Sequence, residues 1–76
     1  MANTILVLAV GSPVTIDRNL KVRDEDNFVV SESMVALKGE KTTIREVCVD
    51  ADGIWYKLNI DNGSWWWDEK CFERTN

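Results

Sequence analysis

The alternation of apolar and polar residues along the chain predicts a succession of short β-strands. Residues 5–10 form an apolar run, which a Gly-Ser-Pro turn signal at residues 11–13 closes. Residues 14–16 then alternate as a half-buried strand should. No clear period follows over residues 17–34, where we expect a long functional loop or an excursion packed by its own side chains. Residues 31–37 favour one helical turn, with Ser31 as its N-cap.

The second half of the chain predicts a three-stranded meander. Residues 42–49 are rich in β-branched side chains, which favour strands. Residues 54–60 alternate, so that Tyr56 and Leu58 face one way and Trp55 faces the other. Because alternation with one apolar face is typical of a sheet packed on a core, both segments are predicted to be strands.

Turn signals separate these strands. Asp52-Gly53 and Asn62-Gly63 favour the positive backbone φ of tight hairpins. Residues 65–67, three consecutive tryptophans, predict another short strand, and residues 68–72 predict a single 3₁₀ turn. Short antiparallel strands joined by tight turns, with no long helix, indicate an all-β domain of the small-barrel or sandwich type.

The tryptophan run allows two interpretations. Alternation places Trp65 and Trp67 on one face and Trp66 on the other. One of these two faces must pack against the core, and the other is then exposed. The aromatic side chains then either compensate for a small core or form an exposed patch that anchors a partner.

Composition restricts the chemistry. The 76 residues include nine Lys and Arg, thirteen Asp and Glu, two Cys and no His, for a net charge of −4. A Cys₄ or Cys₂His₂ zinc site is therefore excluded, and we predict no metal and no other cofactor. Cys48 and Cys71 are expected to be unlinked thiols of a cytosolic protein, because small secreted domains use more disulfides.

No arrangement of residues predicts an enzyme. Carboxylate pairs such as Asp50 and Asp52 lie in predicted turns, and no base accompanies the serines or cysteines. Residues 50–53 begin like a calcium loop but lack the bidentate Glu that such a loop needs. The apolar run at residues 5–10 is too short to span a membrane and has no basic residues before it, so we predict no membrane segment and no signal peptide.

Charges of both signs gather in the first loop. The basic members are Arg18, Lys21 and Arg23, and the acidic members are Asp24, Glu25 and Asp26. The simpler interpretation is a solvated loop. The sharper one is an acidic surface that occupies a basic groove on another protein, since complementary potentials steer association. Because nucleic-acid binding relies on Lys and Arg, the net negative charge makes nucleic acid the less expected partner.

Four segments that together span residues 10–73 carry a resemblance to a known family. Residues 10–16 are similar to an opening V-G-D-x-V-x-V strand, and residues 28–34 and 37–44 to T-E-D-M and G-K-x-x-x-I segments. Residues 61–73 are similar to a closing G-x-W-x-W-x-x-E-M-F/L-E segment. The family that these segments resemble comprises small SH3-like barrel proteins of unknown function, encoded by phages and prophages of Gram-positive bacteria. A more distant similarity is to the repeat domain of the mind bomb ubiquitin ligases.

This resemblance implies a fold and a source but no activity. The implied fold is a small SH3-like β-barrel of about five strands, with a long first loop and a C-terminal 3₁₀ turn. The resemblance also implies that Trp65 and Trp67 pack in the core and that Trp66 is exposed, beside Trp55. We treat residues 1–76 as a single domain. Residues 1–9 extend beyond the family's usual start and are expected to add an edge strand or a dimer contact. Cys71 departs from the family pattern, which has Met at that position.

We therefore expect a non-catalytic, phage-encoded protein that modulates or inhibits a host protein in the host cytoplasm. One example of such a target is a defence factor such as a CRISPR component. Trp55 and Trp66 are the predicted anchors, and Asp24, Glu25 and Asp26 are predicted to supply charge complementarity.

Two alternatives stay open. One is a nucleic-acid-binding module that uses Arg18, Lys21, Arg23 and the tryptophan face. The other is a structural or assembly protein that dimerises through residues 5–10, so the chain is expected to be a monomer or a homodimer.

Overall fold

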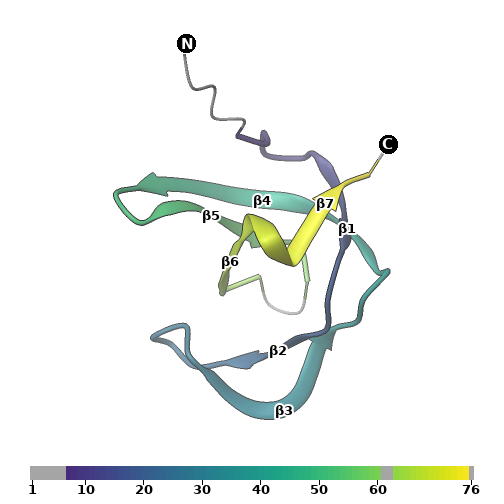
Figure 1. Cartoon of the computed structure of the whole chain (residues 1–76), viewed down its shortest axis with the longest axis vertical. Coiled ribbons are helices and arrows are strands. Elements are labelled where there is room, and N and C mark those ends of the chain that lie inside the picture. Colours follow the sequence, from purple (N-terminus) through teal and green to yellow (C-terminus); the bar gives the residue numbers. More distant parts are fainter. Residues whose placement is uncertain (1–6, 61–62, 76) are drawn as a thin grey trace.

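The computed structural model describes residues 7–60 and 63–75, which form short β-strands and one 3₁₀ helix (Figure 1). In chain order the elements are β1 (Pro13–Ile16), β2 (Leu20–Arg23), β3 (Val29–Ala36), β4 (Lys41–Asp50), β5 (Gly53–Leu58), β6 (Trp66–Asp68), η1 (Glu69–Cys71) and β7 (Phe72–Arg74). One sheet has the order β6-β5-β4-β1-β7, and β2 and β3 pair in a separate hairpin. All pairings are antiparallel. The predicted all-β class is confirmed, and over the described residues the five-stranded sheet is not closed into a barrel.

β4 joins the two halves of the five-stranded sheet. Its first residues pair with β1, where Thr42 lies opposite Val14, and its later residues pair with β5, where Val47 lies opposite Tyr56. The register of the β4–β5 pairing shifts between Ile44 and Glu46, just after the residues that pair with β1. Because such an irregularity bends and twists a strand, β4 can serve both partners without a break.

The core lies between the five-stranded sheet and the β2–β3 hairpin. β1 and β5 bury alternate residues, Val14 and Ile16 in β1 and Tyr56 and Leu58 in β5. Within the core the rings of Tyr56 and Phe72 meet edge to face, with centroids 5.2 Å apart. The buried apolar side chains of the described residues are Val14, Ile16, Leu20, Ala36, Ile44, Tyr56, Leu58, Trp67, Cys71 and Phe72.

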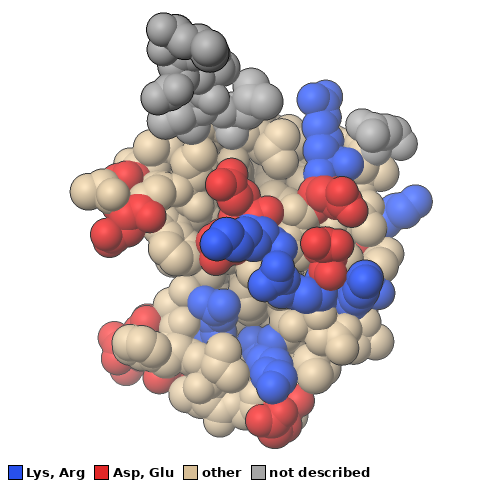
Figure 2. Space-filling view, in the orientation of Figure 1, with Lys and Arg blue, Asp and Glu red and all other residues tan. Residues whose placement is uncertain are grey.

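The tips of two hairpins lie on the same side of the molecule, at the left of Figure 1. One is the turn between β2 and β3, and the other is the turn between β4 and β5. Asp and Glu side chains appear at both tips in Figure 2. The fold thus brings together two acidic turns that lie about twenty-five residues apart in the sequence.

Most of the strand predictions are confirmed. Residues 14–16 lie in β1, residues 42–49 lie in β4, and η1 forms within the 3₁₀ turn predicted over residues 68–72. Of residues 54–60, β5 includes those up to Leu58, and the tryptophan strand begins at the second tryptophan of the run. The Asn62-Gly63 turn lies partly outside the described residues, although the Gly63 amide donates to the carbonyl of Ile60 at 2.8 Å.

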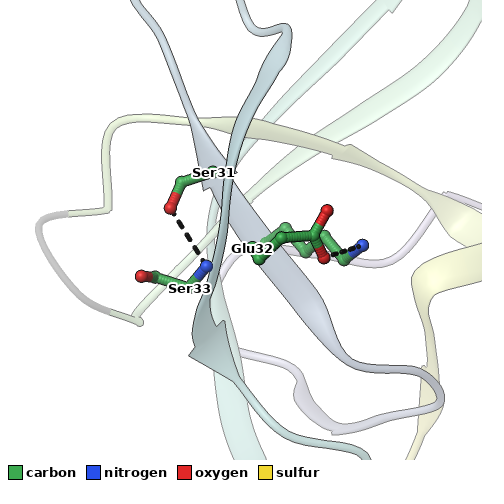
Figure 3. Close-up of polar contacts among 4 residues, drawn as sticks. Ser31, Glu32 and Ser33 are labelled. Atoms are coloured by element: carbon green, nitrogen blue, oxygen red, sulfur yellow. Dashed lines mark hydrogen bonds and ion pairs between the residues drawn. The ribbon is translucent and has the colours of Figure 1, made fainter.

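Two predictions for the first half of the chain are wrong. The long loop expected over residues 17–34 contains β2 and most of β3, and the helical turn expected over residues 31–37 is part of β3. Ser31 does accept a backbone hydrogen bond, as a helix cap would, but from Ser33 at 3.0 Å within an extended chain (Figure 3). The segment instead pairs with β2, and Glu32 of β3 forms an ion pair with Lys21 of β2 at 2.9 Å (Figure 3). This pairing outweighs the local preference for a helical turn.

The expected N-terminal strand falls partly outside the described residues, which begin at Val7. Residues 7–10 are not in a strand. The Leu8 amide donates to the hydroxyl of Tyr56 at 3.1 Å, which ties this segment to the core. A turn then leads into β1, with Gly11 at a φ of 88°, a value that glycine adopts without steric cost.

Candidate functional site

The outer face of β4, β5 and β6 carries the side chains that alternation turns away from the core. In one cross-strand row Cys48 lies opposite Trp55, and Trp55 lies opposite Asp68. In the next row Lys57 of β5 lies opposite Trp66. Residues with this spacing share a face, so the fold brings Trp55 and Trp66 side by side. Both are half-buried, whereas the sequence predicts that Trp66 is exposed.

Trp55 and Trp66 line an open groove of about 290 Å³, which we call the Trp55–Trp66 groove. The turn between β4 and β5 contributes Asp50 and Asp52, and the turn between β2 and β3 contributes Asn27. The remaining lining residue is Cys48. The groove therefore combines aromatic walls with carboxylates, and residues of both hairpin turns line it.

Asn27 fixes the β2–β3 turn to β6. The Trp66 amide donates to Asn27 Oδ1, and Asn27 Nδ2 donates to the Trp66 carbonyl, both at 2.9 Å. One side chain thus makes both hydrogen bonds that a neighbouring strand would make. Asn27 has a φ of 70°, in the left-handed region that Asn tolerates better than most residues. The sequence pattern does not predict Asn27 as a site residue. The one local feature that marks it is the Asp and Asn composition of the segment, which is typical of a turn.

Two tryptophans of β6 each hold a cation against the ring. The guanidinium carbon of Arg23 lies 4.3 Å from the ring centroid of buried Trp67. Arg23 Nε is buried without a hydrogen-bond partner, and the π-face of the indole offsets part of that cost. Lys57 Nζ lies 4.8 Å from the ring centroid of Trp66 and pairs with Glu46 at 3.1 Å.

The turn between β4 and β5 holds one of the two groove carboxylates, that of Asp50, in place. The Asp52 amide donates to Asp50 Oδ1 at 2.8 Å, which makes an Asx turn, and Gly53 follows with a φ of 131°. A second hollow of about 230 Å³ shares Asp52 and Trp55 with the groove. Asp50 and Asp52, considered from the sequence only for acid–base and calcium chemistry, are thus the acidic residues that the fold places beside the tryptophans.

The predicted acidic residues Asp24, Glu25 and Asp26 lie in the β2–β3 turn but do not line the groove. Asp24 Oδ1 accepts hydrogen bonds from the amides of Asp26 and Phe28, at 2.9 and 3.0 Å, so this carboxylate shapes the turn. Glu25 and Asp26 are exposed. They precede Asn27 in the sequence, so they carry negative charge in the same turn as a residue that lines the groove.

The two cysteines are free thiols in different surroundings, as unlinked as the sequence predicts. Cys48 lines the groove and is half-buried. Cys71 is buried, and its Sγ donates to Asp68 Oδ1 at 3.7 Å. Burial, and then the negative charge of Asp68, raises the pKa of the Cys71 thiol. A deprotonated nucleophile is therefore disfavoured at Cys71.

Within residues 7–60 and 63–75, no group of three or more His, Cys, Asp or Glu residues is arranged to hold a metal ion. The same part of the chain has no helix that is long and apolar enough to cross a membrane. Comparison with protein-family models, with curated proteins and with solved structures found no match. What the protein does must therefore be inferred from its own residues.

Proposed function

We propose that this protein is a non-catalytic, phage-encoded module that binds a host protein through the Trp55–Trp66 groove and modulates or inhibits it in the host cytoplasm. One observation carries the proposal: two tryptophans occupy outward positions of the sheet, beside carboxylates, in a 76-residue chain whose core is small. Tryptophan is among the residues most enriched at the energetic hot spots of interfaces. Outward tryptophans therefore support recognition of a partner.

The order already present in the groove supports the same conclusion. Two hydrogen bonds with Asn27 hold the backbone of Trp66, and the Asx turn holds the carboxylate of Asp50 against the amide of Asp52. A site whose groups are ordered before binding loses less conformational entropy on association. The net charge of −4 and the acidic hairpin tips would also steer a basic partner toward this side of the molecule.

The proposal includes an SH3-like fold. Its support is the strand order β6-β5-β4-β1-β7, with η1 before the last strand and an excursion, the β2–β3 hairpin, after the first strand. Strand, excursion, meander and 3₁₀ turn is also the order of the phage-encoded SH3-like barrels that residues 10–73 resemble. An experimental structure in which β7 pairs with a strand other than β1 would contradict this part of the proposal.

The function is tested by capturing partners with tagged protein from a nuclease-treated lysate of a Gram-positive host. We expect the wild type to retain one host protein in near-stoichiometric amount, identified by mass spectrometry. Trp55→Ala and Trp66→Ala should each lose it. Leu37→Ala is the matched control, because Leu37 is an apolar side chain, 51% exposed, in the turn between β3 and β4.

The acidic turn is tested separately by changing Glu25 and Asp26 to Lys. Asp24 is kept, because its carboxylate holds the turn through two backbone hydrogen bonds. We expect slower association and weaker capture, since rim charges act mainly on the association rate. Circular dichroism confirms that each variant is folded. Capture that survives both tryptophan substitutions and this charge reversal would contradict the proposed site.

A second candidate, a nucleic-acid-binding module, is favoured by the Lys and Arg side chains that gather on the face shown in Figure 2. Two of the predicted basic residues are engaged within the fold, Arg23 on Trp67 and Lys21 with Glu32. Because these contacts compete with phosphate, they weigh against this candidate. A gel shift with single-stranded oligonucleotides that weakens steeply with added salt would favour it over protein binding.

A further inference from the structure

The Trp55–Trp66 groove has the size of a pocket for one side chain. Its volume of about 290 Å³ is at or below the lower end of the range of about 300–1,000 Å³ that sites for whole small molecules occupy. It is also open to solvent, between two hairpin tips. Such a site suits a single group that a protein partner inserts.

The lining of the groove favours a cation. The carboxylates of Asp50 and Asp52 line it together with the indoles of Trp55 and Trp66. A cation is attracted by the negative face of an indole and by a carboxylate, and a site that offers both is selective for positive charge. An apolar partner group would leave the carboxylates without compensation.

The hollow that adjoins the groove has the same sign of charge. It shares Trp55 and Asp52 and adds Asp68, Glu69 and Lys70. The carboxylates lining the two hollows therefore outnumber the ammonium groups by four to one. Phosphate and other anions are disfavoured here, so the local charge supports a basic protein segment over a nucleic acid.

Two indoles of the fold already contact cations of the same chain. Arg23 lies over Trp67 at 4.3 Å, and Lys57 lies over Trp66 at 4.8 Å. Among the described residues this contact occurs at Trp66 and Trp67 but not at Trp55. Trp55 is also the one of these three tryptophans that borders both hollows. Its ring is therefore in position to receive a cation from outside the chain.

We propose that the Trp55–Trp66 groove binds the guanidinium of an arginine in a basic segment of the partner protein. Arginine fits better than lysine because its planar guanidinium stacks on an indole, is more weakly hydrated than an ammonium, and donates two parallel hydrogen bonds to one carboxylate. Asp50 and Asp52 are the carboxylates in reach of such a group in the groove. This inference rests on the proposed function, because it names the group that the partner inserts.

The inference is tested by nuclear magnetic resonance, with ¹⁵N-labelled protein and the peptide acetyl-Gly-Ser-Arg-Ser-Gly-amide. Two matched peptides carry lysine or citrulline in place of arginine, and citrulline keeps the shape of arginine without its charge. The arginine peptide should shift the indole N–H signals of Trp55 and Trp66, with a dissociation constant on the order of 1 mM. The lysine peptide should bind less tightly, and the citrulline peptide about tenfold less tightly than arginine.

Substitutions test whether the carboxylates of Asp50 and Asp52 bind the arginine peptide. Asp50→Asn with Asp52→Asn removes both groove charges, while an amide oxygen at position 50 can still accept the hydrogen bond that closes the turn. This double variant should bind the arginine peptide about tenfold more weakly. The charge-matched control is Asp17→Asn with Glu73→Gln, two exposed carboxylates that line neither hollow. The control should bind as the wild type does.

Cys48 reports independently on the position of the peptide. Its thiol lines the groove, whereas Cys71 is buried and serves as the internal reference. At a peptide concentration equal to the dissociation constant, the arginine peptide should slow alkylation of Cys48 by iodoacetamide by about half. The citrulline peptide at the same concentration should leave the rate nearly unchanged.

Equal binding of the arginine and citrulline peptides, or full binding by the Asp50→Asn, Asp52→Asn variant, would overturn the inference. Self-association in sedimentation that this variant abolishes would assign the groove to a second copy of the chain, and displacement of the peptide by an oligonucleotide would assign it to nucleic acid. Both results would also overturn it. If no peptide binds but capture of a host protein still needs Trp55 and Trp66, the inference fails and the proposed function stands. If the peptide binds as expected and no host protein is captured, only the proposed function fails.

Discussion

The two faces of the β5–β6 pair use the same residue types in opposite ways. On the inner face Trp67 is 2% exposed, and the thiol of Cys71 lies in the same core. On the outer face Trp55 and Trp66 are half-buried, and the thiol of Cys48 lines the groove beside them. Residue type alone therefore does not separate a tryptophan of the core from one that lines a surface groove; the neighbours on each face do.

Those neighbours differ in chemistry. The inner face meets apolar side chains of β1, β2 and β7, such as Ile16, Leu20 and Phe72. The outer face meets the polar residues of two turns, Asn27 from one and Asp50 from the other. Substitutions on the inner face should therefore change stability most, and those on the outer face should change binding most.

Trp67→Ala should have the largest effect on stability. Its indole is buried and supports the guanidinium of Arg23, so the substitution leaves both a cavity and a poorly compensated charge. Loss of a buried aromatic ring costs about 3–5 kcal/mol, against a total of about 5–15 kcal/mol for a small domain. Urea unfolding followed by circular dichroism measures the loss. Trp67→Phe keeps a ring and should lose less; an alanine variant as stable as the wild type would contradict the core assignment.

The inner face was predictable because its signal is local. Alternation over consecutive residues is enough to assign Tyr56, Leu58 and Trp67 to one side of a sheet. The β2–β3 hairpin was missed because its register shifts on both sides of Lys21, which interrupts the alternation that reveals a strand. The β3 strand was then mistaken in part for a helical turn, since Ser31 also suits a cap.

The outer face was predictable only in part. Alternation was enough to place Trp55 and Trp66 on one side, and the fold brings them to one groove. Asn27 bonds to Trp66 across 39 residues of sequence, and Asp50 of β4 lines the same groove as Trp66 of β6. Contacts of this kind depend on how the hairpins pack, which no local pattern contains. The local sequence instead favours Asp24, Glu25 and Asp26 as site residues, because they form the densest run of acidic side chains.

Asn27→Ala should have the next largest effect. It removes both side-chain hydrogen bonds to Trp66 and places alanine at a φ of 70°, so we expect a loss of about 2 kcal/mol. Asn27→Gly also loses the amide but adopts this φ readily, and should lose about 1 kcal/mol less. Urea unfolding gives both values. If neither variant is less stable than the wild type, the two hydrogen bonds between Asn27 and Trp66 are not needed for folding.

Trp55→Ala and Trp66→Ala should change stability less than either of the preceding substitutions. Each removes a half-buried outward side chain, for which we expect about 1 kcal/mol or less. For Trp66 this includes the contact with Lys57, worth about 0.5–1 kcal/mol. The midpoint of thermal unfolding should fall by about 8 °C at most. A fall as large as that of Trp67→Ala would make these tryptophans core residues and remove the main support for the proposed function.

The smallest expected effect is a pH dependence of the free energy of unfolding, for which the two thiols are compared. Burial, and then Asp68, raises the pKa of Cys71, so between the unfolded and folded pKa values the folded state holds a proton that the unfolded chain has lost. The free energy of unfolding therefore falls as the pH rises in that interval. This contribution is fully present below the pKa of the unfolded thiol, about 8.5, and is lost as the pH rises through the higher pKa of the folded one.

The measurement is urea unfolding of the wild type, Cys71→Ala and Cys48→Ala from pH 7 to 10. Comparing these proteins separates the contribution of the Cys71 thiol from those of the other groups that titrate in this range. The difference in stability between the wild type and Cys71→Ala should narrow with rising pH, because only the wild type loses the contribution of the buried thiol. Cys48→Ala keeps Cys71, so the contribution of the buried thiol stays in this variant. If the difference between the wild type and Cys71→Ala does not narrow, the burial of the Cys71 thiol would be contradicted, and with it the assignment of this side of the sheet to the core.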